Sequence, residues 1–225
     1  MSQPSPEPRL LPPLPPRRPD RRRERTSAAI VSAASRLFYE QGVARTTTDE
    51  IAALAGVSVG SIYAHFHDKQ TLFVSMCARA LEINERYIVN RAWSVSPLQR
   101  LLNTGDAYLQ FAQDETEAFY LTTMRVREPS DNPKIHEMEQ RMNERIAGIA
   151  QQIGADAAAA IEAGEIQPVP IDKLLLFLWG SWAGVISLHM RIDAFRADHF
   201  DVGESLHLAS AVLARGLGGT MPKAA

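Results

Sequence analysis

Residues 47–73 read TTDEIAALAGVSVGSIYAHFHDKQTLF, and this stretch decides how the rest of the chain is interpreted. Thr47 and Glu50 have the Thr-x-x-Glu spacing of a capping box, in which the hydroxyl and the carboxylate each bond a backbone amide at the start of a helix. Gly56 can adopt the left-handed conformation that ends a helix, since it has no Cβ. The pattern predicts a short helix with an apolar face made of Ile51, Ala52, Leu54 and Ala55.

A second short helix is expected over about 59–66, with Ser58 as its N-cap. Ile62 and Phe66 give this helix a buried side, whereas the residues between them are small or polar and leave a thin face. Two short helices joined by a tight glycine turn are typical of a helix-turn-helix, in which the second helix fits the DNA major groove. The sequence therefore predicts a DNA-reading element.

The same residues carry a family resemblance. The segments IVSAASRLFYEQG (30–42), TTTDEIAALAGVS (46–58) and VGSIYAHFHDKQTLF (59–73) resemble the N-terminal domain of TetR/AcrR-family transcriptional regulators over about 45 residues, with matching spacing. The remaining two thirds of the chain resemble that family only in architecture. The resemblance implies a dimeric regulator whose second domain encloses an effector and whose last two long helices pair with those of a second subunit.

Charge is distributed unevenly along the 225 residues. Residues 1–75 contain 10 Lys and Arg against 7 Asp and Glu, whereas residues 76–225 contain 14 against 19. A cationic N-terminal part beside an acidic remainder suits binding of a polyanion at one end only. Eight of the fourteen prolines lie in residues 1–19 with Arg9, Arg17 and Arg18 among them, so residues 1–20 are expected to form a disordered tail. The tail is either a solvated extension or a cationic arm that contacts DNA.

The chain is predicted to be all-α, because apolar residues recur at helical spacing from residue 21 onward and no strand pattern is present. A three-helix DNA-binding domain is expected over 21–67, a helical effector-binding and dimerisation domain over 68–217, and a tail over 218–225. Helices are predicted over about 21–41, 68–93, 98–114, 115–127 and 135–163, followed by a helix capped by Asp172 and a last one over 202–215 that is capped by Asp201. The helix that begins at Asp68 would link the two domains.

The DNA-contacting residues are predicted from their chemistry, and the family resemblance points the same way. Thr47 and Thr48 lie at a helix N-terminus that suits a phosphate, and Tyr63 and Lys69 are further phosphate donors. Tyr63 could equally be a structural ring packed on the first helix. Ser61 and His65 can bond base edges, while Val59 or Ala64 could meet a thymine methyl. The predicted groove-facing set is Val59, Gly60, Ser61, Ala64 and His65.

A small apolar or aromatic effector is the expected ligand of the second domain, held in an apolar cavity with a few polar anchors. The same side chains could instead simply fill the core. The candidate lining residues are Tyr108, Phe111, Tyr120, Met124, Met142, Trp182 and His189. No cofactor and no metal are expected, since His65 and His67 diverge by about 200° around a helix. No catalytic motif is visible, so an enzyme on a helical scaffold is the remote alternative.

The family resemblance implies that residues near 172–191 and 202–215 form the homodimer interface. The first of these helices is apolar almost all round, and burial on more than one side is what that arrangement requires. Its apolar run, 174–188, is 15 residues long and is expected to be too short for a membrane span. A single cysteine, Cys77, and no visible secretory signal favour a cytoplasmic protein without internal disulfides. The predicted function is that of a ligand-responsive repressor on a palindromic operator, the alternative being a regulator controlled by a protein partner.

Overall fold

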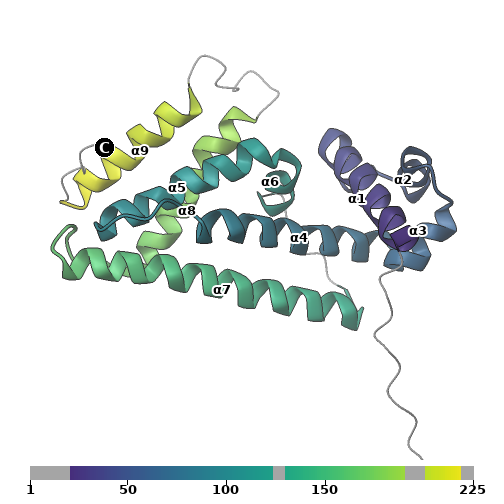
Figure 1. Cartoon of the computed structure of the whole chain (residues 1–225), viewed down its shortest axis with the longest axis horizontal. Coiled ribbons are helices and arrows are strands. Elements are labelled where there is room, and N and C mark those ends of the chain that lie inside the picture. Colours follow the sequence, from purple (N-terminus) through teal and green to yellow (C-terminus); the bar gives the residue numbers. More distant parts are fainter. Residues whose placement is uncertain (1–20, 124–129, 191–200, 219–225) are drawn as a thin grey trace, which may run out of the picture.

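The computed structural model describes residues 21–123, 130–190 and 201–218, and these form an elongated bundle of α-helices without strands (Figure 1). The three N-terminal helices gather at one end, and the remaining helices extend from there toward the other end. The helices are α1 (Arg21–Gln41), α2 (Thr48–Ala55), α3 (Val59–Phe66), α4 (Lys69–Val89), α5 (Pro97–Asp114), α6 (Thr116–Thr123), α7 (Pro133–Glu162), α8 (Ile171–His189) and α9 (Val202–Gly216). The predicted all-α fold is confirmed.

Local signals in the sequence set the helix boundaries at the N-terminal end. Thr47 caps α2 in a complete capping box with Glu50. Gly56 ends α2 in the left-handed region at φ 66°, and Ser58 then caps α3 by accepting from the amide of Ser61 at 3.2 Å. The turn between α2 and α3 therefore forms as predicted. Gly56 makes this turn possible, because a residue without a Cβ adopts a positive φ at low cost.

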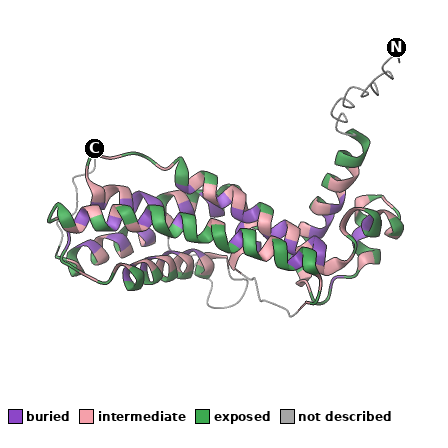
Figure 2. Cartoon of the chain, turned by 90° about the horizontal axis from the view of Figure 1, so that it is seen from below, coloured by how far each residue is buried: buried purple, intermediate pink, exposed green. Residues whose placement is uncertain are grey.

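Helix α4 joins the N-terminal helices to the rest of the bundle. Its first turns pack on α1, where the rings of Phe38 and Phe73 meet edge to face at 5.8 Å. Its later turns pack on α5, α6 and α7. Buried residues lie along the inner faces of these helices, as Figure 2 shows. One continuous core thus runs through both halves of the described chain.

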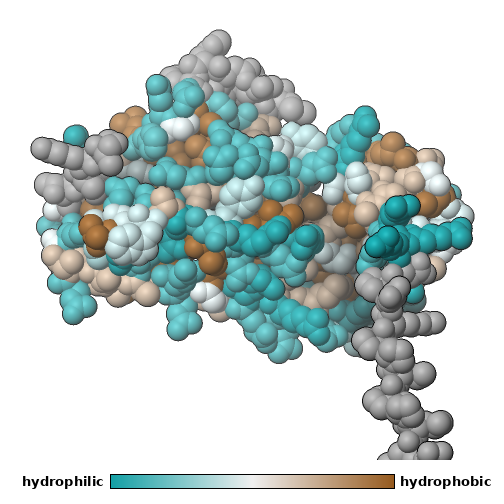
Figure 3. Space-filling view, in the orientation of Figure 1, coloured by the Kyte–Doolittle hydropathy of each residue, from teal (hydrophilic) through white to brown (hydrophobic). Residues whose placement is uncertain are grey.

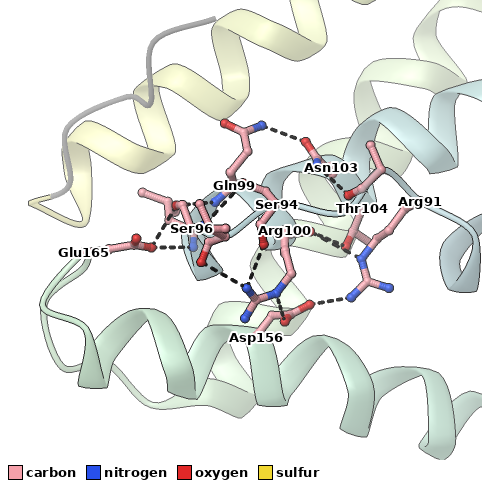
Figure 4. A network of polar contacts seen from close by, with 12 residues as sticks. Arg91, Ser94, Ser96, Gln99, Arg100, Asn103, Thr104, Asp156 and Glu165 are labelled. Atoms are coloured by element: carbon pink, nitrogen blue, oxygen red, sulfur yellow. Dashed lines mark hydrogen bonds and ion pairs between the residues drawn. The ribbon is translucent and has the colours of Figure 1, made fainter. Parts of the chain in front are cut away.

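The far end of α4 is held by a network of charged and polar groups (Figure 4). Asp156 of α7 accepts from Arg91, which follows α4, and from Nε of Arg100 on α5 at 2.8 Å. The side chains of Arg91 and Asp156 are only 8% and 13% exposed. Glu165 accepts from the amide of Leu98 at 2.6 Å. Removing one member of a largely buried ion pair typically costs several kcal/mol, so this network fixes the α4–α5 connection against α7.

Several expected boundaries are wrong. Helix α4 ends at Val89 rather than near Trp93, which is 76% exposed in the following loop. Asp172 does not cap α8, because Pro170 is the N-cap. Asp172 lies in the first turn, where its negative charge interacts favourably with the helix dipole. Leu54 is 46% exposed, since α2 buries only Ile51 and Ala52. Helix α6 is described only as far as Thr123, and the rest of its predicted range lies outside the described residues.

Helix α8 buries one side only. Leu174, Leu178, Trp182 and Ile186, spaced four apart, are buried against α5, α7 and α9. Leu176 and Phe177 on the other side are 76% and 58% exposed. The expected second buried side is thus uncovered in a single chain. By length and composition alone, these 19 residues are long and apolar enough to cross a membrane, a test that the core helix of a soluble protein also passes.

Gly105 on α5 allows α8 to approach closely. A Cβ at this position would lie 2.7 Å from Nε1 of Trp182, whose side chain is 1% exposed and cannot move aside. Only glycine fits such a contact without displacing the indole ring.

Replacing Gly105 with Ala is therefore expected to lower the free energy of unfolding by about 1–3 kcal/mol, since overpacking displaces Trp182. Gly148→Ala on α7 is the matched control, because a Cβ there meets nothing within 4 Å and should stabilise the helix slightly. Urea denaturation of both variants measures the difference. Equal midpoints for the two would contradict the close contact.

Candidate nucleic-acid interface

Helix α3 presents its thin face outward. Ile62 is fully buried and anchors the helix, whereas Gly60 and Ala64 are exposed and Tyr63 is 50% exposed. Val59, Ser61 and His65 are half-buried beside them. The hydroxyl of Ser61 lies 2.9 Å from that of the N-cap Ser58, which orients both groups at the start of the helix. All five predicted groove-facing residues thus lie within one eight-residue helix that has a small, accessible side.

The N-terminus of α2 is shaped by a short hydrogen-bond network. The amide and the hydroxyl of Thr47 donate to Glu50 at 2.8 and 2.9 Å, and Thr48 begins the helix half-exposed. These bonds stabilise the ionised carboxylate and lower the pKa of Glu50, with the backbone amide of Thr47 as the main cause. The carboxylate therefore supports the cap at neutral pH and loses that role as the pH falls through its lowered pKa.

Lys69 has a structural partner that the sequence did not reveal. Its Nζ donates to the backbone oxygens of Val43 and Thr46 at 3.0 and 2.8 Å, which ties the first turn of α4 to the α1–α2 loop. An ammonium has three N–H groups, so a phosphate contact through the third remains compatible with this geometry. Tyr63, in contrast, is exposed rather than packed into the core.

The start of α1 adds residues to this surface. Arg23, Glu24 and Ser27 line an open hollow of about 360 Å³ together with His65 of α3. In the space-filling view a strongly hydrophilic patch lies at this end of the molecule (Figure 3). The prediction of the groove-facing set was confined to α3. The four-residue spacing of Arg23 and Ser27, which places them on one side of α1, was the available signal.

A strained residue connects α3 to α4. His67 has φ 72° and ψ −49°, and the amide of Asp68 donates to the carbonyl of Phe66 at 2.9 Å across it. This is a γ-turn, which places a non-glycine residue in a sparsely populated region. Asp68 follows the turn and caps α4, since its carboxylate accepts a hydrogen bond from the amide of Thr71. The angle between the reading helix and α4 is therefore set within three residues.

The predicted effector-lining set is only partly brought together. Tyr108 and Phe111 are buried with ring centroids 6.1 Å apart, and Tyr108 also contacts Phe119 and Trp179, which the sequence analysis omitted. Burial strongly raises the pKa of Tyr108, so its phenol stays neutral. Met142 and Trp182 are buried on α7 and α8. A hollow of about 600 Å³ lies between α4 and α5, lined in part by Tyr87, Asn90, Asp106 and Gln110, and these residues were not in the predicted set.

Tyr120 and His189, two further members of the predicted effector-lining set, lie apart from this aromatic cluster. The ring of Tyr120 meets Tyr39 of α1 edge to face at 5.5 Å, which joins α6 to the DNA-reading end. His189 is the last residue of α8 and is half-exposed, two helical turns beyond Trp182. Met124 lies outside the described residues.

Replacing Thr47 with Ala should raise the pKa of Glu50 part of the way back toward its ordinary value, because the hydroxyl is lost while the amide remains. The titration of the Glu50 side chain by NMR measures this shift. Thr48→Ala, which removes a neighbouring hydroxyl that does not bond Glu50, is the control. An unchanged Glu50 titration in the Thr47 variant would contradict the capping geometry.

Comparison with known proteins agrees with this description. A family model described as "Bacterial regulatory proteins, tetR family" matches residues 30–76. The transcriptional repressor BepR of Brucella suis is 38% identical over 105 residues, which cover 45% of this chain and 50% of the repressor. The regulator TtgR of Pseudomonas putida is 52% identical over 56 residues, or 25% of this chain and 27% of that protein. The matches thus span half or less of these relatives' lengths.

Solved structures extend the likeness to the whole fold. A tetR-family regulatory protein from Rhodococcus RHA1 superposes with a TM-score of 0.70 at 20% identity, covering 87% of this chain and 98% of that one. The TetR-family regulator PfmR of Thermus thermophilus gives 0.66 at 17% identity, covering 86% and 99%. The sequence similarity to the family is confined to the N-terminal residues, whereas the superpositions show that the all-α fold is shared along most of the chain. Residues 30–76 of the chain thus match the tetR family of bacterial regulatory proteins, and the described chain has the fold of solved TetR-family structures.

Proposed function

We propose that the chain is a repressor that binds a palindromic operator as a homodimer and releases it in response to a small effector. The observation that carries this proposal is the geometry of α3, which buries Ile62 and leaves Gly60 and Ala64 exposed. Side chains this small let the helix axis approach base edges closely in the major groove. The N-terminus of α2 and the arginine-rich start of α1 supply phosphate contacts beside it.

The reading mode follows from the residues on α3. The helix carries no arginine, so strong bidentate recognition of guanine does not come from it. Ser61 and His65 supply one or two base-edge hydrogen bonds, and the remaining specificity comes from DNA shape and backbone contacts. Thr47, Thr48, Tyr63 and Lys69 are assigned to the phosphates on either side.

A second copy of the chain is the proposed partner of the uncovered face of α8 and α9. Leu176 and Phe177 on α8 and Leu208 and Val212 on α9 are each more than half exposed. A Cβ at Gly180 or Gly184 would meet nothing within 4 Å, so a facing helix could approach closely along this side. A symmetric dimer buries the same patch on both copies and spaces two reading helices about 34–36 Å apart, the repeat of the major groove.

An effector that acts on such a dimer must bind one arrangement of the reading helices more tightly than the other. The contact between Tyr39 and Tyr120 supports this proposal, since it connects α6 of the second domain to α1 of the first. Selection of binding sites from random DNA, with the purified chain, tests the regulator proposal directly. Recovery of a palindromic sequence is expected, whereas the absence of any enriched sequence would overturn the proposal.

Replacing Ser61 or His65 with Ala is expected to change the preferred operator sequence, because these groups are assigned to base edges. Lys69→Ala should instead weaken binding to all duplexes similarly and reduce the salt slope by about one. Gel shifts at several salt concentrations measure both effects, with circular dichroism as the control for folding. A Lys69 variant that binds like the wild type would contradict the proposed docking.

Phe177→Glu is expected to dissociate the dimer, since an unpaired carboxylate buried in an apolar interface is strongly unfavourable. Ile146→Glu on α7 is the matched control, because Ile146 is also exposed but lies outside the α8–α9 face. Sedimentation velocity should show a monomer for the first variant and a dimer for the second. Two dimers, or two monomers, would count against the assigned interface.

A further inference from the structure

A buried carboxamide on α4 stands out among the described residues. Asn84 is 0% exposed, yet neither its Nδ2 nor its Oδ1 has a hydrogen-bond partner among them. It occupies the apolar face of α4, one turn from both Ala80 and Ile88. Buried polar groups in folded proteins are nearly always paired, and an unpaired one is retained at a cost in stability. Such a group therefore points to a partner that binds it.

The surroundings of Asn84 can be placed from its neighbours on α4. Three residues later, the ring of Tyr87 packs against Phe111 of α5 at 5.7 Å. Two turns earlier, Sγ of Cys77 lies 3.7 Å from the carbonyl oxygen of Leu121 on α6. Asn84 thus faces the region between α5 and α6, where Phe111 contacts Phe119 and Tyr108. The carboxamide borders the buried aromatic cluster of the second domain.

A second unpaired donor lies on the other side of this cluster. Nε1 of Trp182 is buried without a partner among the described residues and sits against Gly105 of α5. One turn away from each, the rings of Trp179 and Tyr108 contact each other at an angle of 40° with centroids 4.7 Å apart. On the two sides of α5, the core therefore combines aromatic faces with unused hydrogen-bonding groups of α4 and α8, the composition of a ligand site.

The groove between α4 and α5 provides a route inward. Tyr87 lines this hollow of about 600 Å³ and also contacts Phe111, so its ring separates the groove from the aromatic cluster. Its hydroxyl donates to Asp114 at the half-exposed edge, at 2.9 Å. Residues three apart are neighbours on a helix surface, so the Tyr87 ring lies beside the buried Asn84 as well as beside the groove.

We infer that Asn84 is the polar anchor of the effector site, and that the effector is a mainly aromatic or apolar molecule carrying an adjacent hydrogen-bond donor and acceptor, as in an amide or a lactam. A carboxamide offers N–H donors and a carbonyl acceptor side by side, so such a group can pair with it through two reciprocal hydrogen bonds. This inference rests on the proposed ligand-responsive function and specifies the chemistry of its ligand.

The position of Asn84 also gives the ligand leverage on the DNA-reading end. The Asp156 network fixes the chain at Arg91, seven residues beyond Asn84, whereas Lys69 lies fifteen residues before it. Asn84 and Lys69 are about 22 Å apart along α4 at 1.5 Å per residue, so a shift of α4 at Asn84 reaches Lys69 along one continuous helix. Lys69 is bonded to the α1–α2 loop, which would move with it.

The ligand-free test compares two buried asparagines in the full chain. Asn84→Leu should raise the thermal midpoint by about 3–6 °C, because an unpaired polar group is replaced by an apolar one. Asn103→Leu should lower the midpoint, since Asn103 donates to the carbonyl of Ala92 and accepts from Gln99, both at 2.7 Å. Asn84→Ala serves if leucine is too large, and should then destabilise less than Met142→Ala. Destabilisation of both Asn84 variants to the extent of Asn103→Leu would overturn the inference.

The ligand test uses benzamide and toluene as probes of similar shape, with and without the amide. In the wild type, benzamide should raise the thermal midpoint more than toluene at equal concentration, by stabilising the folded state through binding. Asn84→Leu should reverse that order. The same order in both proteins, or no response of the wild type to benzamide, would overturn the assignment.

Operator binding separates this inference from the proposed function. Fluorescence anisotropy with the selected operator should show wild-type affinity for Asn84→Leu alone, and a several-fold loss of affinity on adding benzamide only in the wild type. A chain that binds no DNA but prefers benzamide in an Asn84-dependent way would refute the regulator proposal and leave the anchor intact. Normal DNA binding without that preference would refute the anchor alone.

Discussion

The ion pairs that Asp156 makes with Arg91 and Arg100 are the constraint on which the rest of the structure depends. They hold the α4–α5 loop and the start of α5 to the C-terminal part of α7, and they are largely shielded from water. Arg145 of α7 also pairs with Glu82 and Glu85 of α4, so α7 holds α4 at more than one point. From there α4 runs as one helix to Lys69, where it packs on the N-terminal helices.

The same helix explains why the two halves of the chain share one core. The three N-terminal helices together contain too few residues to bury enough apolar surface by themselves, and Phe38 packs on Phe73 of α4. Lys69 and Asp68 add polar ties at the same junction. These contacts of Phe73, Lys69 and Asp68 hold the chain in place directly after His67, and this keeps the strained γ-turn at that residue. Stability and orientation of the DNA-reading end are therefore properties of α4 as much as of α1–α3.

Sequence reasoning succeeded where local chemistry decides the structure. The Thr47–Glu50 box, the left-handed Gly56 and the caps Ser58, Asp68 and Asp201 act within a few residues, so their outcome is visible in the spacing alone. It failed where tertiary contacts decide. Nothing in the sequence around Trp93 shows that Arg91 will turn toward Asp156, 65 positions away, and end α4 early. The exposure of Leu54 likewise depends on which neighbours α2 has.

The candidate sites show the same division. The accessible face of α3 could be predicted, since its small residues share one side of a short helix. The partners of Lys69 could not, because they are backbone oxygens of the loop that follows α1. The spacing of Arg23 and Ser27 places them on one side of α1, but its position beside His65 depends on how α1 packs on α3. Asn84 was recognisable in principle, as a polar residue at a position whose helical neighbours Ala80 and Ile88 are apolar. Its lack of a partner became visible only once α5 and α6 were placed around it.

The edge-to-face contact of Tyr39 with Tyr120 has a consequence for chimeric regulators. A fusion joined at residue 67 would keep the whole helix-turn-helix but would exchange the aromatic surface on which α1 rests. The transferred helices α1–α3 would then pack against the α6 of another protein, and the orientation of α1 would depend on that new contact. Exchanging α1–α3 between related chains thus calls for moving both tyrosines together, so that α1 keeps the aromatic surface on which it packs.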